Sequence, residues 1–189
     1  FGALDVLVNN ARRLHRGPGL PPRGNALPVN ETDPMIWRET VMVNVVGTYF
    51  MTHAALPHFI GRRAGKIVNL STSLRNFHRA NQSPYGVTKA AIEAETLIWS
   101  NDLKDTGVTV NSLLPGGACD SDPERVRSPD RKLLPIDIMN PLMIWLASER
   151  SDHVTGHRFV GRLWDPALAP ADAAEVAREE PVFHGQEAD

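Results

Sequence analysis

The chain contains a single cysteine, Cys119, in 189 residues, and this excludes an internal disulfide framework. The chain has no large excess of positive or negative charge, with 20 Lys and Arg and 22 Asp and Glu. This composition gives no general attraction to nucleic acid or anionic lipid. No apolar run approaches the roughly 18 residues that a membrane span needs, and no signal-peptide pattern opens the chain. We therefore expect a cytoplasmic protein without nucleic-acid or membrane partners.

What the sequence does contain is an alternation of β-branched runs and helical patterns. Hydrophobic residues make up 42% of the chain, which suffices for one core and one domain. Strands are predicted at residues 6–8, 67–70, 108–114 and 158–160, and helices at 33–60, with a break near Asn44, at 84–105 and at about 135–147. Gly107 is expected to end the helix before it. Apolar strands separated by helices of this length indicate an α/β fold with a parallel sheet covered on both faces.

The most informative local pattern is the pair Tyr85 and Lys89 in S-P-Y-G-V-T-K-A-A, because a spacing of four on a helix places a phenol and an ammonium on one face. A cation within about 4–6 Å favours the phenolate form of a tyrosine, so the pair is typical of proton transfer. Ser83 and Pro84 suit the N-cap and first turn, which would put Tyr85 at the start of the helix. The same spacing also arises by chance on amphipathic helices, so it needs support from other motifs.

Four further segments provide that support. In chain order they are L-D-V-L-V-N-N-A (4–11), W-R-E-T-V-M-V-N-V-V-G-T-Y (37–49), G-K-I-V-N-L-S-T-S (65–73) and V-T-V-N-S-L-L-P-G-G (108–117). In this order, and with the tyrosine–lysine pair, they resemble the short-chain dehydrogenase/reductase family from residue 1 to about residue 165. The resemblance implies a Rossmann-like doubly wound parallel sheet, here an N-terminally truncated three-layer sandwich. Residues 166–189, rich in alanine, proline and acids, are expected to be an exposed C-terminal extension.

The resemblance also makes one absence significant. A dinucleotide-binding half opens with a strand, a glycine-rich turn and a helix whose N-terminus holds the pyrophosphate. The chain instead starts with Phe1 at what resembles the family's fourth strand, so at least two βα units, on the order of 60 residues, are expected to be missing. The glycines and prolines of residues 17–24 are no substitute, because proline has no N–H to offer a phosphate. Residues 12–30 are interpreted as a flexible loop.

The resemblance assigns catalytic roles to several side chains. Asn44 matches the family's asparagine, which interrupts a helix and anchors a proton relay. The family's serine usually lies thirteen residues before the tyrosine, and that position is Thr72, with Ser73 one residue later. Only one of these two should face the cleft if the strand stays regular, and we favour Ser73 because a primary hydroxyl is less hindered. Tyr85 would exchange the proton, and Lys89 would support the phenolate and bind the nicotinamide ribose.

Further residues are expected to border the cofactor, NAD or NADP. Asn10 and Ala11 match a family signature next to the adenine ribose, and Arg12 stands where the family has glycine, so it could narrow the cleft or contact a phosphate. Pro115 and Gly116 match a turn that lets the backbone pass close to the nicotinamide. A small hydroxyl residue commonly follows that turn, and Ser121 is the best candidate, whereas Cys119 is interpreted as a spacer. His153 and His157 lack the further ligands of a metal site.

Two hypotheses follow from these assignments. In the first, the protein is an NAD(P)-dependent oxidoreductase that interconverts a small-molecule secondary alcohol and a ketone. In the second, it is a non-catalytic scaffold, or an inactive fragment, that keeps the fold without holding a dinucleotide. The resemblance also implies a homodimer or homotetramer built on the helices at 44–60 and 84–105, with Ala55, Ile92 and Ile98 at the interface.

Overall fold

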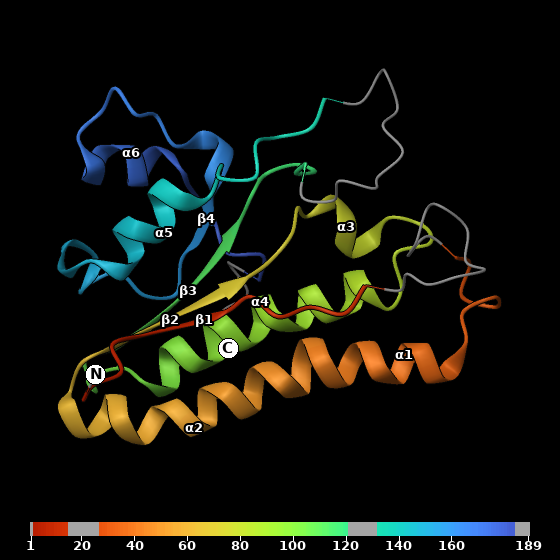
Figure 1. The fold of residues 1–189 in the computed structure, drawn as a ribbon, viewed down its shortest axis with the longest axis horizontal. Coiled ribbons are helices and arrows are strands. Elements are labelled where there is room, and N and C mark those ends of the chain that lie inside the picture. The colour runs from red at the N-terminus through yellow and green to blue at the C-terminus, as the bar shows by residue number, and fades with distance from the viewer. Residues whose placement is uncertain (1, 15–26, 121–131, 184–189) are drawn as a thin grey trace, which may run out of the picture.

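The computed structural model describes residues 2–14, 27–120 and 132–183, and its centre is a five-stranded sheet (Figure 1). The strands lie in the order β1 (Val6–Asn9), β2 (Gly65–Leu70), β3 (Val108–Leu114), β4 (Arg158–Val160) and β5 (Arg178–Glu179). The first four are parallel, and β5 is antiparallel to β4. The structure confirms the four predicted strands and the α/β fold class, and it adds β5 at the edge of the sheet.

The predicted break near Asn44 is a π-helical turn, Met42–Val46, between α1 (Pro34–Val41) and α2 (Gly47–Arg62). Asp33 begins this run, because its side chain accepts a 2.8 Å hydrogen bond from the N–H of Met35. The remaining helices are α3 (Arg75–His78), α4 (Tyr85–Asp102), α5 (Asn140–Ala147) and α6 (Pro170–Val176), with 3-10 turns at Glu149–Ser151 and Gly161–Leu163.

Two details of the helix ends differ from the prediction. Ser83 does not cap α4: no side chain caps this helix, and the Ser83 hydroxyl accepts a 3.1 Å hydrogen bond from the Trp37 indole instead. Gly107 does not end α4, which stops at Asp102. Gly107 instead turns the chain into β3 with a φ of +84°, and a Cβ added at this residue would lie 2.0 Å from the Arg63 carbonyl oxygen. Close packing of two turns therefore requires this glycine.

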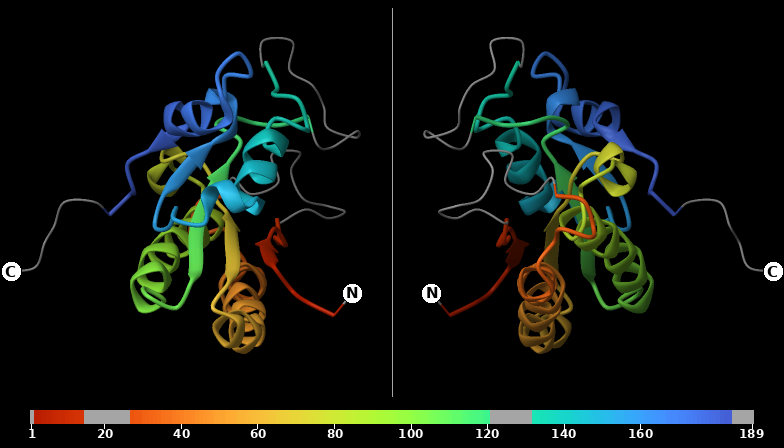
Figure 2. Two further views of the ribbon diagram at one scale, coloured as in Figure 1. Left: turned by 90° about the vertical axis from the view of Figure 1, so that its left-hand side faces the viewer. Right: turned by 90° about the vertical axis from the view of Figure 1, so that its right-hand side faces the viewer.

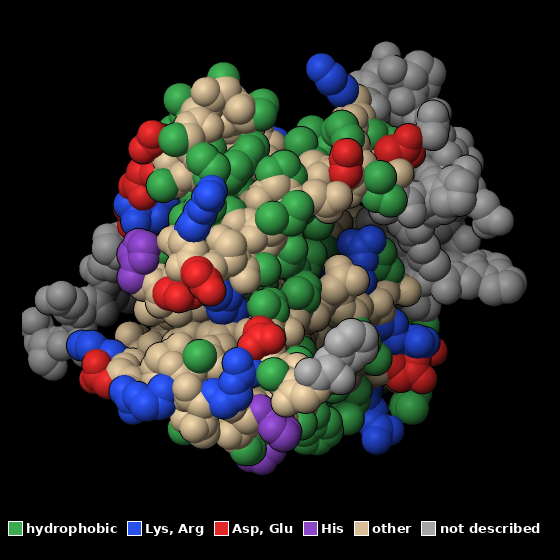
Figure 3. All heavy atoms as spheres, turned by 60° about the vertical axis from the view of Figure 1, so that its left-hand side comes forward, with side chains coloured by type: hydrophobic (Ala, Val, Ile, Leu, Met, Phe, Trp, Pro, Cys, Tyr) green, Lys and Arg blue, Asp and Glu red, His purple; other side chains and the backbone are tan. Residues whose placement is uncertain are grey.

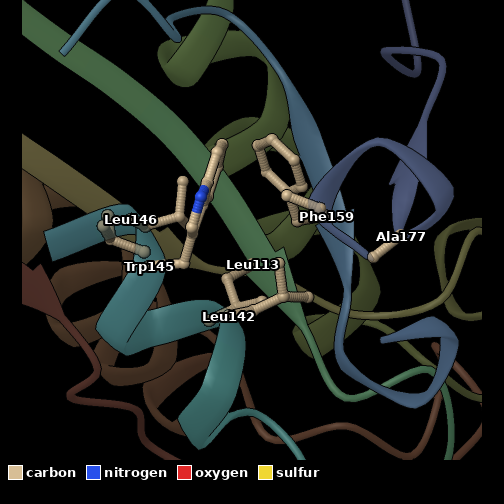
Figure 4. Close-up of a cluster of buried hydrophobic side chains, with 8 residues drawn as sticks. Leu113, Leu142, Trp145, Leu146, Phe159 and Ala177 are labelled. Atoms are coloured by element: carbon tan, nitrogen blue, oxygen red, sulfur yellow. The ribbon is translucent and has the colours of Figure 1, made fainter. Parts of the chain in front are cut away.

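Helices cover both faces of the sheet, with α2 and α4 on one side and α5 and α6 on the other (Figure 2). Successive strand residues alternate between the two faces, so Ile67 packs with Phe59 and Val110 under α2 and α4, whereas Val68 belongs to the opposite core. In that second core the Trp145 and Phe159 rings meet at a centroid distance of 5.9 Å (Figure 4). The doubly wound, three-layer arrangement expected from the sequence is therefore present.

The C-terminal segment is exposed at most of its described residues, but three alanines anchor it to the rest of the fold. Ala173, Ala174 and Ala177 have at most 1% of their surface exposed, and Ala174 and Ala177 pack into the core with residues of α5. Beyond them, β5 pairs with β4 through Arg178 and Glu179. The prediction of an exposed extension therefore missed the attachment of α6 and β5 to the sheet, which small residues on the inner side of this helix allow.

The expected contacts between copies of α2 and α4 also need correction. Ala55 and Ile92 are 5% and 2% exposed and pack inside their own subunit, so they are not available to a partner. Ile98, in contrast, is 55% exposed, and Phe50 and Met51 on α2 are 60% and 57% exposed. Of the three residues expected at the interface, only Ile98 contributes to the exposed apolar surface of α2 and α4, together with Phe50 and Met51.

The surface carries mixed charge. On the face shown in Figure 3, Lys and Arg side chains are interspersed with Asp and Glu around a central group of apolar side chains. That face has no stripe of basic side chains of the kind that tracks a nucleic-acid backbone. Among the described helices, none combines the length and the apolar character required to cross a membrane.

Candidate active site

The candidate residues meet where the parallel strands end. Because the carboxyl ends of parallel strands share one edge of a sheet, the segments that follow β1, β2 and β3 lie beside one another there. These segments carry Asn10 to Arg12, Ser71 to Ser73, and Pro115 with Gly116. The helix α4 starts at the same edge, since Lys89 on its second turn reaches the carbonyl of Leu70, the last residue of β2.

Tyr85 and Lys89 occupy the first two turns of α4. Tyr85 is the first helical residue and is half-buried, whereas Lys89 is only 4% exposed. The Lys89 ammonium donates a 2.6 Å hydrogen bond to the Leu70 carbonyl. Burial, and next the Arg12 cation, lower the pKa of Lys89 to about 8, and the charge of Glu93 opposes this shift. The ammonium therefore stays mostly protonated at pH 7 and has further N–H donors for a ligand.

Asn44 lies in the π-helical turn and is 1% exposed. Its amide nitrogen donates to the Thr88 hydroxyl at 3.1 Å and to the Arg13 carbonyl at 3.3 Å, and its amide oxygen accepts from the Arg13 N–H at 2.6 Å. The side chain thus joins α4, one residue before Lys89, to the segment after β1. Single π-helical turns within helices are frequent at functional sites.

The two candidate hydroxyls are held differently. Thr72 is 8% exposed, and its hydroxyl accepts a 2.7 Å hydrogen bond from the Asn76 amide, which leaves its own proton free to donate. Ser73 is half-buried, and its carbonyl accepts the N–H of Asn76 at 2.8 Å. The neighbouring Ser71 hydroxyl is buried and has no hydrogen-bond partner in the described part of the chain. Thr72 therefore differs from Ser73 in that a hydrogen bond from Asn76 orients its hydroxyl.

Packing of α3 on α4 depends on Gly86. A Cβ at this position would lie 2.1 Å from the Asn76 carbonyl oxygen, so no larger residue fits without moving α3. Because Gly86 directly follows Tyr85, this contact places the Asn76 side chain, and with it the Thr72 hydroxyl, next to the start of α4. The sequence shows the glycine but not the backbone that approaches it.

The turn after β3 contains Pro115 and Gly116, which were predicted to border the nicotinamide. Gly116 has a φ of +85°, and a Cβ there would lie 2.6 Å from side-chain atoms of Val160 and Arg162. The carbonyl of Pro115 accepts a 3.1 Å hydrogen bond from the Arg162 N–H, which fixes the turn. Cys119 pairs with Leu134 in an isolated parallel bridge. Ser121 lies outside the described residues.

On the opposite side of the edge, Asn10, Ala11 and Arg12 are exposed. The preceding residue, Asn9, is buried and donates to the Thr52 hydroxyl at 3.1 Å and to the Asn69 amide oxygen at 2.8 Å, which ties the end of β1 to α2 and β2. Arg12 lies close enough to Lys89 to lower its pKa. No group of three His, Cys, Asp or Glu side chains suited to a metal ion occurs among residues 2–14, 27–120 and 132–183.

A buried ion pair that sequence reasoning missed lies behind the hydroxyls. Arg158 at the start of β4 pairs with Glu93 on α4, and their side chains are 1% and 4% exposed. Glu93 also accepts a 2.9 Å hydrogen bond from the Ser112 hydroxyl on β3. The only signal in the sequence is that Glu93 lies four residues after Lys89 and therefore shares the inward face of α4.

Comparison with known proteins gives consistent matches. A family model described as short chain dehydrogenase matches residues 1–131. The chain is 30% identical over 172 residues to 2-dehydro-3-deoxy-D-gluconate 5-dehydrogenase of Escherichia coli K12, covering 83% of this chain and 63% of the relative. It is 35% identical over 167 residues to the (2S)-[(R)-hydroxy(phenyl)methyl]succinyl-CoA dehydrogenase subunit BbsD of Thauera aromatica, covering 82% of this chain and 62% of that relative.

Solved structures agree with these relatives. A short chain dehydrogenase from Salmonella enterica serovar Typhi CT18 has a TM-score of 0.71 at 30% identity, covering 86% of this chain and 64% of that one. A structure from Escherichia coli CFT073 that is complexed with NADPH has a TM-score of 0.68 at 30% identity, covering 86% and 64%. The chain thus spans less than two thirds of the length of the proteins that it matches.

Proposed function

Because this chain belongs to the short-chain dehydrogenase family, we propose that it forms the catalytic part of an NAD(P)-dependent oxidoreductase that interconverts a secondary alcohol and a ketone. The observation that carries the proposal is the convergence at one sheet edge of Tyr85, the buried Lys89 ammonium, and the Thr72 hydroxyl oriented by Asn76. A phenol, a cation and a hydroxyl donor are the three groups that a carbonyl oxygen needs when it gains charge and then a proton.

Each side chain has a separate role in the direction of ketone reduction. NAD or NADP, when bound, supplies the hydride or takes it back. The Thr72 hydroxyl donates a hydrogen bond to the substrate oxygen and stabilises the negative charge that develops there. Tyr85 transfers its proton to that oxygen, so the alcohol leaves and a phenolate remains. The Lys89 cation stabilises this phenolate, and a proton returns from solvent along a relay that Asn44 anchors.

For the cofactor, the chain offers residues at the nicotinamide end. The Lys89 ammonium would bind the ribose hydroxyls, and the turn at Pro115 and Gly116, with Ser121 after it, would border the nicotinamide. Asn10 and Ala11 would border the adenine ribose. Arg12 would contact a phosphate, since its guanidinium is exposed beside this edge. The complex of the Escherichia coli CFT073 structure with NADPH supports a nicotinamide dinucleotide but leaves both NAD and NADP open here.

The second function, a scaffold without catalysis, is tested by dinucleotide binding. Residues 2–14, 27–120 and 132–183 contain no glycine-rich strand–turn–helix unit, so calorimetric titration of this chain with NADH or NADPH should show no saturable binding. The extended form, meaning this chain preceded by such a unit, should bind one of them and reduce a ketone. An extended form that binds neither dinucleotide would reject the oxidoreductase and favour the scaffold.

Which hydroxyl acts is a further proposal. We now favour Thr72 over Ser73 as the catalytic hydroxyl, although steric hindrance alone favours Ser73. The reason is that a donor to the developing oxyanion must be oriented in advance, and Asn76 orients Thr72. In the extended form, Thr72→Ala should lower turnover by about 10²–10³-fold, the usual loss of one such donor. Ser73→Ala should be milder, and Thr72→Ser should retain most activity. Steady-state kinetics on the three variants decides, and the opposite ranking assigns the role to Ser73.

Self-association through α2 and α4 is also proposed, as a homodimer or homotetramer. Phe50, Met51 and Ile98 expose apolar surface on these two helices, and two-fold contacts are the commonest kind in soluble oligomers. Light scattering at micromolar concentration should give at least twice the 20.8 kDa monomer mass. Ile98→Asp should shift the mass to that of a monomer. Ile144→Asp, at a 70% exposed position on α5, is the control and should leave the mass unchanged.

A further inference from the structure

Arg158 is an arginine with 1% of its surface exposed, and each side of its guanidinium has a partner. One terminal nitrogen pairs with Glu93, and the other donates a 2.8 Å hydrogen bond to the Thr72 carbonyl. Its Nε donates at 3.1 Å to Glu179, and its Cζ lies 6.0 Å from the centre of the Phe77 ring. Burying a guanidinium is unfavourable unless it is paired and hydrogen-bonded, and here these four partners meet that requirement.

These contacts join segments that are far apart in the sequence. Thr72 belongs to the loop after β2, Phe77 to α3, Glu93 to α4 one turn beyond Lys89, and Glu179 to β5. Ser112 on β3 holds the other oxygen of Glu93, so the network is anchored to the centre of the sheet. Two hydrogen bonds therefore hold Thr72 in place. Its carbonyl accepts from Arg158, and its hydroxyl accepts from the Asn76 amide.

We propose that Arg158 is a positioning residue for the hydroxyl site, and that Glu179 on the C-terminal strand completes it. Arg158 fixes the backbone of Thr72 against α4, so that the hydroxyl and Tyr85 keep a constant relation. Glu179 holds the guanidinium from the far side, which makes β5 a support of the site and not only an edge of the sheet. Lysine could not replace this arginine, because a single ammonium lacks the planar fork that reaches three partners in different directions.

The positioning role rests on the proposed function, but its first test needs no activity. Hydrogen exchange of the 189-residue chain, measured by mass spectrometry, reports the amides of Asn76 and Phe77, which bond to the carbonyls of Ser73 and Leu74. Arg158→Met should speed exchange at these amides at least about tenfold relative to peptides of α2, because local opening of the loop becomes easier. Glu179→Gln should speed it in the same peptides by a smaller factor.

The matched control is Glu175→Gln, which removes one carboxylate from the same C-terminal segment. Glu175 pairs with Arg178 at the surface, whereas the carboxylates that pair with Arg158 are those of Glu93 and Glu179, so exchange near Asn76 should equal that of the unaltered chain. If Arg158→Met does not fold, Arg158→Lys and Glu179→Gln carry the test. Unchanged exchange near Asn76 in the folded Arg158 variant and in Glu179→Gln, or equal acceleration by Glu175→Gln, would overturn the proposal.

A second readout separates positioning from general destabilisation. In the extended form, Glu179→Gln should lower kcat while leaving the dinucleotide KM unchanged, because Glu179 bonds to Arg158, which in turn bonds to the Thr72 carbonyl. A fall in kcat together with a rise in the dinucleotide KM, or no change in either constant, contradicts a positioning role. If the unaltered extended form is inactive, the proposed function fails, and the exchange measurement still decides whether Arg158 orders the loop.

Discussion

Replacing Tyr85 by phenylalanine should reduce the turnover of the extended form by about 10²–10⁴-fold, the range that general acid–base catalysis contributes. The substitution removes one oxygen and keeps the ring, so packing at the start of α4 and dinucleotide affinity should be nearly unchanged. Steady-state kinetics, calorimetric binding of the dinucleotide and a thermal melt measure the three quantities on the same preparation.

The chain offers a matched control, because it has two tyrosines and the other, Tyr49, lies on α2 with 46% of its surface exposed. Tyr49→Phe removes the same oxygen away from the sheet edge and should retain full turnover. Full activity in Tyr85→Phe would reject the catalytic assignment. A large loss accompanied by unfolding would show a structural role for the hydroxyl instead.

Lys89→Met should impair catalysis in two ways at once. The ammonium is proposed both to stabilise the phenolate and to bind the nicotinamide ribose, so turnover should fall by at least about 10²-fold and dinucleotide affinity should weaken as well. This second effect distinguishes the variant from Tyr85→Phe. Lys104→Met, which removes an exposed lysine beyond the end of α4, is the control and should change neither quantity. Wild-type dinucleotide affinity in Lys89→Met would contradict the ribose role.

The same substitution should change how stability depends on pH. Burial, followed by Arg12, lowers the pKa of Lys89 to about 8 in the folded chain, against an ordinary value of 10.5. Between these values the unfolded chain binds a proton that the folded chain has released, so the free energy of unfolding rises with pH across this window. The rise is at most about 3–4 kcal/mol, since the pKa values differ by about 2.5 units and one unit corresponds to roughly 1.4 kcal/mol.

Urea denaturation of the 189-residue chain at pH 7.5 and at pH 10 measures this contribution. Other groups titrate over the same interval in both proteins, so the informative quantity is the difference between the unaltered chain and Lys89→Met. The unaltered chain should gain stability relative to the variant as the pH rises. An identical pH dependence in the two proteins would show that the ammonium is not held in a desolvated position.

The sequence by itself determined the elements that depend on local pattern. Strands β1 to β4 are short segments rich in Val, Leu, Ile and Phe, and such segments favour extended structure wherever both faces of a sheet are covered. The placement of Tyr85 and Lys89 on one face of a helix follows from the helical period, which acts over only four residues. The break near Asn44 was predicted from the resemblance to the family. Ordered motifs also sufficed for the family, because they fix residue types at sites where backbone and chemistry leave little choice.

Only the tertiary structure decided the contacts between distant segments. Glu93 and Arg158 are 65 positions apart, and Thr72 and Arg158 are 86 apart, so no local pattern connects them. The composition of α6 also suits an exposed tail, and Ala173 and Ala174 are buried because the assembled fold offers a surface that fits small side chains. Likewise Asn76 orients Thr72 only because Gly86 lets α3 approach α4. Burial and pairing are properties of the assembled layers, and their free energy depends on neighbours that the chain brings together only when it folds.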